Sequence, residues 1–163
     1  MWQIDRVRVH ERSEGFALAT RGRLVVSVWR TEVTRDRVAA IDRAIAELVP
    51  TCGGKGYGSV TVIERGTSMR MPEDARAAST ALQKRWAEHM RVSGYLVDGP
   101  GFLIASVRTL TAGLQLVTRA RVPIRVYATA EELGGFVAPY VAMSATEIAD
   151  VVKEARAAGV VAR

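Results

Sequence analysis

The sequence is short of the residues that build metal sites and disulfide frameworks. Its 163 residues include one cysteine, Cys52, and two histidines, His10 and His89. A single cysteine excludes an internal disulfide, and these three residues do not have the spacing of a structural zinc site. Cys52 has no neighbouring base in its glycine-rich surroundings, so we expect no thiol chemistry there. The sequence therefore predicts neither a metal nor another cofactor.

Long apolar runs are missing as well. No segment of about 18 residues is both apolar and uncharged, as a membrane-spanning helix requires, and the longest apolar region contains Asp98 and Arg108. The N-terminal segment lacks the apolar centre of a secretory signal. We therefore expect a soluble, cytoplasmic protein without a membrane span. With 48% hydrophobic residues the chain is long enough for one well-buried core, which favours a single domain over residues 1–163.

Lysine is scarce, whereas arginine is abundant. Arginine supplies 20 of the 23 basic residues, and the net charge is +6. A basic surplus of this kind can indicate a nucleic-acid partner. The arginines are spread along the chain without runs of adjacent basic residues, and arginine-rich usage is also typical of GC-rich genomes. Nucleic-acid binding through the basic surface is therefore a secondary alternative.

Hydrophobic periodicity divides the chain into strands followed by alternating helices and strands. Apolar residues recur at every second position in the first thirty residues, and Leu24, Val26 and Val28 share one face of a strand. From Thr34 onwards the spacing is that of a helix, and Thr34 is suited to cap it. We expect strands at 6–10, 16–20, 23–29, 60–63, 95–97 and 122–127, and helices at 34–49, 73 to about 92 and 102–117, followed by two helices that begin after Thr129 and Ser144 and are separated near Pro139.

This order of elements predicts an α/β fold. Strand–helix alternation implies right-handed crossovers and mostly parallel pairing, and the first strands add an antiparallel hairpin at one edge. The fold class that we expect is a single domain with one mixed, mostly parallel sheet and four to five helices. Residues 144–158 form an extra C-terminal helix.

Polar residues follow the predicted parallel strands at the points where these end. Glu64 follows one strand and Asp98 the next. Ligands of open α/β sheets bind beyond the carboxyl ends of the strands, where two carboxylates can also pair for acid–base chemistry. Nothing in the sequence sets the separation of these two carboxylates, and we assign no catalytic residue. The candidates for interaction or ligand binding are Glu64, Thr67, Ser68, Arg70, Asp98, Gly99, Gly101 and Phe102.

The segment Asp98-Gly99-Pro100-Gly101 allows two interpretations. Backbone N–H groups at the start of the following helix can hold an anion, as they do in phosphate-binding loops. Asp98 would repel that anion, and short corners between a strand and a helix need glycine and proline for their backbone conformation. We therefore interpret the segment as a tight corner.

The hairpin followed by an amphipathic helix, and the terminal strand and helix IRVYATAEEL at 124–133, resemble the STAS domains. This family comprises anti-sigma-factor antagonists and regulatory domains of anion transporters. The similarity covers residues 15 to 138 and is closest to the stand-alone SpoIIAA-like branch. It implies a module that binds protein partners without catalysis and, in antagonists, a phosphorylated serine or threonine at the start of the second helix. Here Thr67 and Ser68 are the nearest acceptors, but no Asp-Ser pair is present and Pro72-Glu73-Asp74 occupies the helix start.

We therefore expect a protein-interaction module of bacterial regulation without enzymatic activity. Its surfaces would lie near the 64–74 loop and the helix that begins at Phe102. That helix is apolar over a wider arc than one sheet-facing side requires. The surplus fits a homodimer interface, which we favour, or a pocket for a small apolar or lipid-like ligand, which is the main alternative function.

Overall fold

In the described part of the chain, six strands form one sheet, in which their spatial order is the order of the chain. The computed structural model describes residues 6–118 and 122–159, without the side chains of Phe102 and residues 114–118. The first three strands pair antiparallel, and the third to the sixth pair parallel. They are β1 (Arg8–Arg12), β2 (Phe16–Arg21), β3 (Leu24–Trp29), β4 (Tyr57–Ile63), β5 (Met90–Val97) and β6 (Ile124–Tyr127).

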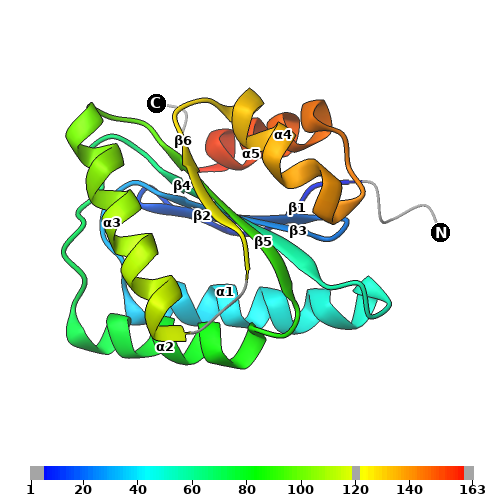
Figure 1. Ribbon diagram of the computed structural model, residues 1–163, viewed down its shortest axis with the longest axis horizontal. Coiled ribbons are helices and arrows are strands. Elements are labelled where there is room, and N and C mark those ends of the chain that lie inside the picture. The colour runs from blue at the N-terminus through cyan, green and yellow to red at the C-terminus, as the bar shows by residue number, and fades with distance from the viewer. Residues whose placement is uncertain (1–5, 119–121, 160–163) are drawn as a thin grey trace.

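The helices form a layer on each face of this sheet (Figure 1). Three of them connect successive parallel strands and lie on one face, whereas the last two cover the other face. The described helices include none that is both long and apolar enough to cross a membrane. They are α1 (Arg35–Leu48) with the short 3-10 helix η1 (Val49–Cys52), α2 (Glu73–Trp86), α3 (Gly101–Thr118), α4 (Ala130–Val141) and α5 (Ala145–Ala158). The α/β fold class expected from the sequence is confirmed.

Three helices begin at the capping residues that the sequence indicates. The side chains of Thr34 and Thr129 accept backbone N–H groups of α1 and α4. Ser144 and Glu147 form a reciprocal capping box at the start of α5. These bonds satisfy donors that have no partner within the first turn of a helix. Local chemistry therefore sets where these helices begin.

One face of the sheet carries a continuous aliphatic core and is called the aliphatic face. Alternate residues of β2 to β5 point to this face, where α4 and α5 cover them. The C-terminal helix α5 thus completes a layer of the fold. The fully buried members include Val26, Val28, Val60, Val62, Val92, Leu133, Val137, Ile148 and Val151.

The opposite face holds two separate apolar clusters. One cluster joins Phe16 and Trp29 to α1, and its edge includes Leu82 and Trp86 of α2. The other joins the ends of β4 and β5 to Val107 of α3. Helix α2 packs mainly against α1, and its only buried residue is Ala75.

The structure corrects three predicted boundaries: the end of α2, the start of β5 and the bounds of β1. The helix expected to reach about residue 92 ends at Trp86, and the strand expected at 95–97 begins at Met90. Trp86 and Met90 continue a helical spacing, but the backbone turns at Ala87 and Met90 pairs with Tyr57. Pairing along the whole of β4 outweighs the local helical pattern. The first strand, expected at 6–10, lies at Arg8–Arg12 and contains a bulge.

The boundary near Pro139 is also corrected. Pro139 lies inside α4, which continues to Val141. The helix ends at Ala142, whose φ of 55° places it in the left-handed region. A proline this close to the end of a helix interrupts only its last turn, so the helix continues past the ring.

Candidate functional site

The carboxyl edge of the parallel strands brings Glu64 and Asp98 to one arginine. Arg156, in the last turn of α5, donates from Nε to Glu64 Oε1 at 2.9 Å and from Nη2 to Glu64 Oε2 at 3.1 Å. Its Nη2 also lies 3.5 Å from Asp98 Oδ2. Hydrogen bonding to Glu64 raises the pKa of Arg156 above its ordinary value, against an opposing effect of burial. The two carboxylates are therefore joined through a cation and do not form the acid–base pair considered from the sequence.

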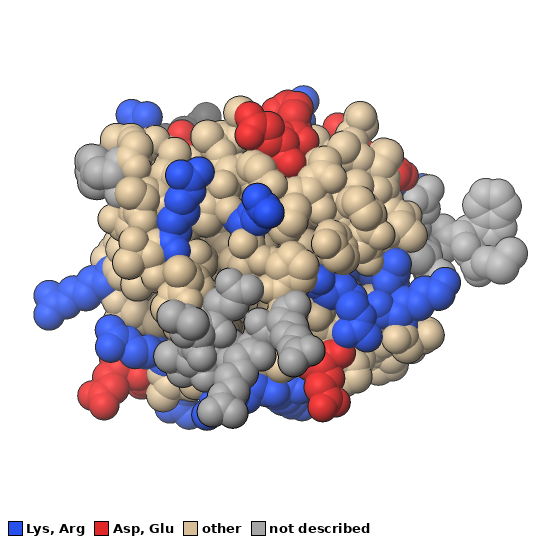
Figure 2. All heavy atoms as spheres, in the orientation of Figure 1, with Lys and Arg blue, Asp and Glu red and all other residues tan. Residues whose placement is uncertain are grey.

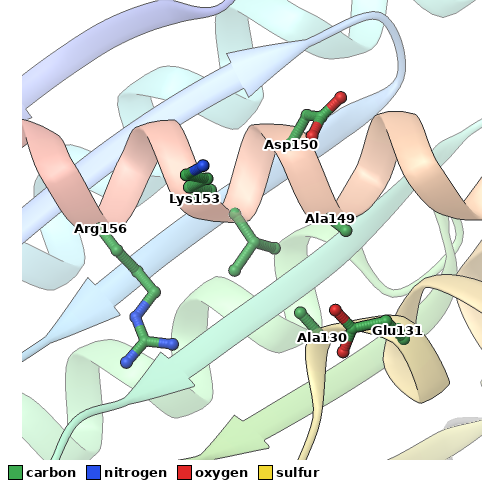
Figure 3. A pocket seen from close by; sticks show the side chains of 7 residues that line it. Ala130, Glu131, Ala149, Asp150, Lys153 and Arg156 are labelled. Atoms are coloured by element: carbon green, nitrogen blue, oxygen red, sulfur yellow. The ribbon is translucent and has the colours of Figure 1, made fainter.

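A shallow cleft of about 370 Å³ adjoins this ion cluster. Figure 3 shows its lining, with Lys153 and Arg156 on α5 and Glu131 at the start of α4. Asp150 is also part of the lining. Both charge signs are present within one small open cleft. Such a surface suits charged side chains of a partner better than it suits an apolar ligand.

Thr67 is held close to the edge of the sheet by its hydroxyl group. Its Oγ1 lies 2.7 Å from the backbone oxygens of both Trp29 and Glu64. The Ser68 N–H donates to the backbone oxygen of Thr31. These bonds anchor the middle of the loop between β4 and α2 to the end of β3.

Ser68 and Arg70 are the exposed candidates of this loop. The Ser68 hydroxyl accepts the Arg70 N–H at 3.3 Å but faces solvent, unlike the partly buried Thr67 hydroxyl. Arg65 is exposed in the same loop. The loop therefore presents a serine and two cations on a fixed support.

The glycines expected at the corner between β5 and α3 differ in their surroundings. A Cβ added at Gly99 would lie 2.6 Å from Leu103 Cδ2, so the end of the Leu103 side chain would have to shift. Nothing lies within 4 Å of a Cβ added at Gly101. The Pro100 carbonyl accepts the N–H groups of the first turn of α3. The Phe102 side chain lies outside the described part of the structure.

Five hydroxyl side chains lie side by side on the sheet, beneath the layer of α1 to α3. We call them the hydroxyl row, and the face that carries them the hydroxyl face. Adjacent strands place Ser27 beside Thr61, Thr61 beside Tyr95, and Ser59 beside Ser93. Ser59, Thr61 and Tyr95 are only partly buried although they belong to central strands. Within the row, Ser27 lies between Val25 and Trp29 of one apolar cluster, and Tyr95 packs against the other cluster.

Sequence reasoning missed both Arg156 and the hydroxyl row. Arg156 lies 92 residues from Glu64, and no local motif marks it. The row had a signal in the alternation of Ser59-Val60-Thr61-Val62, because a strand covered on both faces normally consists of apolar residues throughout. That alternation identifies one polar face.

The remaining polar candidates have structural partners. Cys52 is buried and donates to the Leu48 carbonyl, and burial raises the pKa of its thiol. His10 forms a 2.7 Å hydrogen bond with Thr20 Oγ1. Within residues 6–118 and 122–159, no three histidine, cysteine or acidic side chains are grouped to hold a metal ion.

Comparisons with protein-family models, with curated proteins and with solved structures found no match to this chain.

Proposed function

We propose that the chain is a protein-interaction module of regulatory type, similar in organisation to STAS domains and without catalysis of its own. One observation carries the proposal: the 64–72 loop presents Ser68 and Arg70 to solvent on a rigid support. A loop that is fixed at its base and polar at its tip loses little conformational entropy when it binds a partner. The antiparallel hairpin β2–β3 followed by the amphipathic helix α1, on which the resemblance rests, supports this proposal.

The ion cluster at the carboxyl edge supports binding in preference to acid–base chemistry. Both carboxylate oxygens of Glu64 accept from Arg156, so a proton transfer at Glu64 would first require that pair to break. The adjacent cleft carries Lys153 and Glu131 at the surface. We assign this edge and the 64–72 loop to one continuous partner surface.

Ser68 is the proposed phosphoacceptor, if the partner surface is regulated in this way. Its hydroxyl is exposed, whereas the Thr67 hydroxyl is bonded to two backbone oxygens. A phosphate on Ser68 would lie in a loop with Arg65 and Arg70, which offset its charge.

Site-specific photocrosslinking in the cells that produce the protein tests this function. A photoreactive amino acid replaces Ser68, and the control replaces Ala81, which is exposed on α2. We expect one discrete crosslinked protein from position 68 and none from position 81. The purified partner should then bind the Arg70→Glu variant on the order of tenfold more weakly, since a charge contact becomes repulsive. Identical crosslinks from both positions would count against the proposal.

A small hydrogen-bonding ligand is the second candidate, and the hydroxyl row favours it. Such a ligand would lie between the sheet and the helices α2 and α3. It would contact the partly buried side chains of Ser59, Thr61 and Tyr95. Tyr95 already hydrogen-bonds Ser93 and Thr61 within the row, so the group that an apolar ligand would leave without a partner is the Ser59 hydroxyl, which costs free energy. Native mass spectrometry of the purified protein would reveal such a ligand, and the Ser59→Ala and Thr61→Val changes should lower its occupancy. A ligand-free spectrum for the native protein would remove this candidate.

A further inference from the structure

Strand β6 has one edge that no other described strand covers. It is the last strand of the sheet and pairs on one side only, with β5. The Ser93 N–H donates to the Pro123 carbonyl at 3.0 Å, and Ser93 is registered with Ile124. In a parallel ladder with this register, Arg125 directs its N–H and C=O toward β5. Ile124 and Val126 therefore direct their backbone groups outward, which makes the edge a template for another strand.

A groove of about 750 Å³ follows this edge. Every residue of β6 lines it, together with Arg108 and Thr111 of α3 on one side and Glu132 of α4 on the other. Because the lining includes side chains from both faces of β6, the groove lies at the edge itself. Figure 2 shows the molecule from this side, with basic side chains on a mostly uncharged surface and acidic side chains above, at the start of α4.

The groove has one arginine on each face of the strand. Arg125 is exposed and lies over the Phe136 ring at 5.9 Å, on the α4 side. Arg108 is exposed on the α3 side. Neither guanidinium has an acidic partner within the part of the chain that the structure describes. Glu132 introduces the opposite sign on the α4 side.

We propose that β6 accepts an extended acidic segment of a partner protein as a seventh strand. Backbone hydrogen bonds to Ile124 and Val126 supply affinity, and the two arginines supply selectivity. Successive side chains of a strand point to opposite faces, so two consecutive acidic residues can meet Arg125 and Arg108 together. This surface is separate from the 64–72 loop and goes beyond the function proposed above.

A second copy of the chain suits this edge less well. Two antiparallel β6 strands related by a two-fold axis between Ile124 and Val126 would place Arg125 directly opposite its own copy. Like charges that face each other across two strands are destabilising. The four residues of β6 also offer few backbone bonds to offset that repulsion.

Binding of synthetic peptides, measured by fluorescence anisotropy, tests the proposal. The probes are a fluorescein-labelled peptide TVTDEVT, its lysine counterpart TVTKKVT, and the acidic peptide with methylated backbone nitrogens. We expect the acidic peptide to bind on the order of tenfold more tightly than the lysine peptide, since two ion pairs become repulsive contacts. Backbone methylation should abolish binding, because it removes the donors of the added strand.

Three variants of the protein locate the binding. Arg108→Glu with Arg125→Glu should reverse the preference between the two peptides. The matched control is Arg76→Glu, which changes charge at an exposed position on α2 and should leave binding unchanged. Ile124→Pro removes an outward N–H without removing a bond to β5, and edge strands tolerate proline there. If this variant does not fold, the methylated peptide tests the complementary hydrogen bonds of the same edge on the native protein, from peptide N–H groups to the outward C=O groups of β6.

Several results would overturn the proposal. These are equal affinity for the acidic and lysine peptides, binding that survives both Ile124→Pro and methylation, or no binding of either peptide. Light scattering tests whether a second copy of the chain occupies the β6 edge. A dimer that Ile124→Pro dissociates, and that the acidic peptide does not, would identify a second copy as the occupant.

Discussion

The two faces of the sheet are held by different kinds of contact. On the aliphatic face, Leu133 of α4 and Ile148 of α5 are fully buried against the valines of β3 to β5. On the hydroxyl face, α2 buries only Ala75, and its last turn is tied to α1 through Asp42. Trp86 Nε1 and an Arg85 nitrogen each lie 2.7 Å from an Asp42 carboxylate oxygen.

This difference indicates that the helices on the two faces differ in how firmly they are held to the sheet. Apolar burial contributes most of the stability of a fold, and on the aliphatic face it forms one continuous cluster, whereas on the hydroxyl face it is divided between two clusters that α2 borders only at its edge. The hydroxyl face has polar groups at its centre and a helix that rests on another helix. Segments with few buried apolar contacts open at lower free energy, so we infer that α2 moves more readily than α4 or α5.

The largest expected loss of stability follows from a substitution in the core of the aliphatic face. Leu133→Ala removes a fully buried side chain and should lower the free energy of unfolding by about 2–5 kcal/mol, because it leaves a cavity. Leu82→Ala, on partly buried α2, is the matched change and should cost less than half as much. Urea denaturation of both variants measures the difference. Equal losses would show that α2 and α4 contribute similarly to the free energy of unfolding.

Adjacent residues of β4 provide a sharper test of the same comparison. Val62→Thr introduces a hydroxyl at a fully buried position of the aliphatic face and should cost roughly 1–3 kcal/mol. Thr61→Val changes the neighbouring residue in the opposite sense, on the hydroxyl face. It should alter stability by less than about 1 kcal/mol, because one hydrogen bond is exchanged for apolar burial.

Thermal unfolding of these two variants measures their losses of stability relative to the native protein. A loss from Thr61→Val as large as that from Val62→Thr would show that the hydroxyl row is a structural network. It would then be unavailable to a ligand without unfolding.

The fold class was predictable because its signals are local. The alternation of Leu24, Val26 and Val28 and the caps at Thr34 and Ser144 each lie within a few residues of the element that they define. The end of α2 was not predictable in this way. Trp86 and Met90 satisfy a helical period, and only pairing with β4, which is distant in sequence, assigns Met90 to a strand.

The candidate site was predictable only in part. Glu64 and Asp98 gather at one edge because parallel strands end together, which the element order already implies. Arg156, which joins them, depends on how α5 packs across the aliphatic face, and no sequence pattern defines that packing. The free edge of β6 depends on strand order. That order follows from the three-dimensional arrangement, although the four residues of the strand were predicted.

A smaller loss of stability is expected when the ion pairs between Arg156 of α5 and the carboxylates at the carboxyl edge of the sheet are removed. Arg156→Gln leaves Glu64 without its cation and should lower stability by about 1 kcal/mol, a value reduced by the partial exposure of the guanidinium. Arg156→Lys should recover only part of that loss, since lysine cannot donate two parallel bonds. Unfolding at low and high salt distinguishes the ion pairs from packing, because salt screens exposed charges. A loss that is the same at both salt concentrations would assign the effect to packing.

The smallest expected effect is a pH response that belongs to the hydroxyl face. Burial, and then the charge of Arg8, lower the pKa of His10 below its ordinary value of 6.5. The unfolded chain therefore binds a proton at His10 more readily than the folded chain does. The contribution of His10 to stability is fully present above pH 6.5 and is lost as the pH drops toward the folded pKa. The loss should be roughly a few tenths of a kcal/mol, because solvent screens part of the ring. His10→Gln should reduce this decline, measured by urea denaturation between neutral and mildly acidic pH, whereas His89→Gln, at an exposed turn, is the matched control. An unchanged acid decline in His10→Gln would assign it to the carboxylates instead.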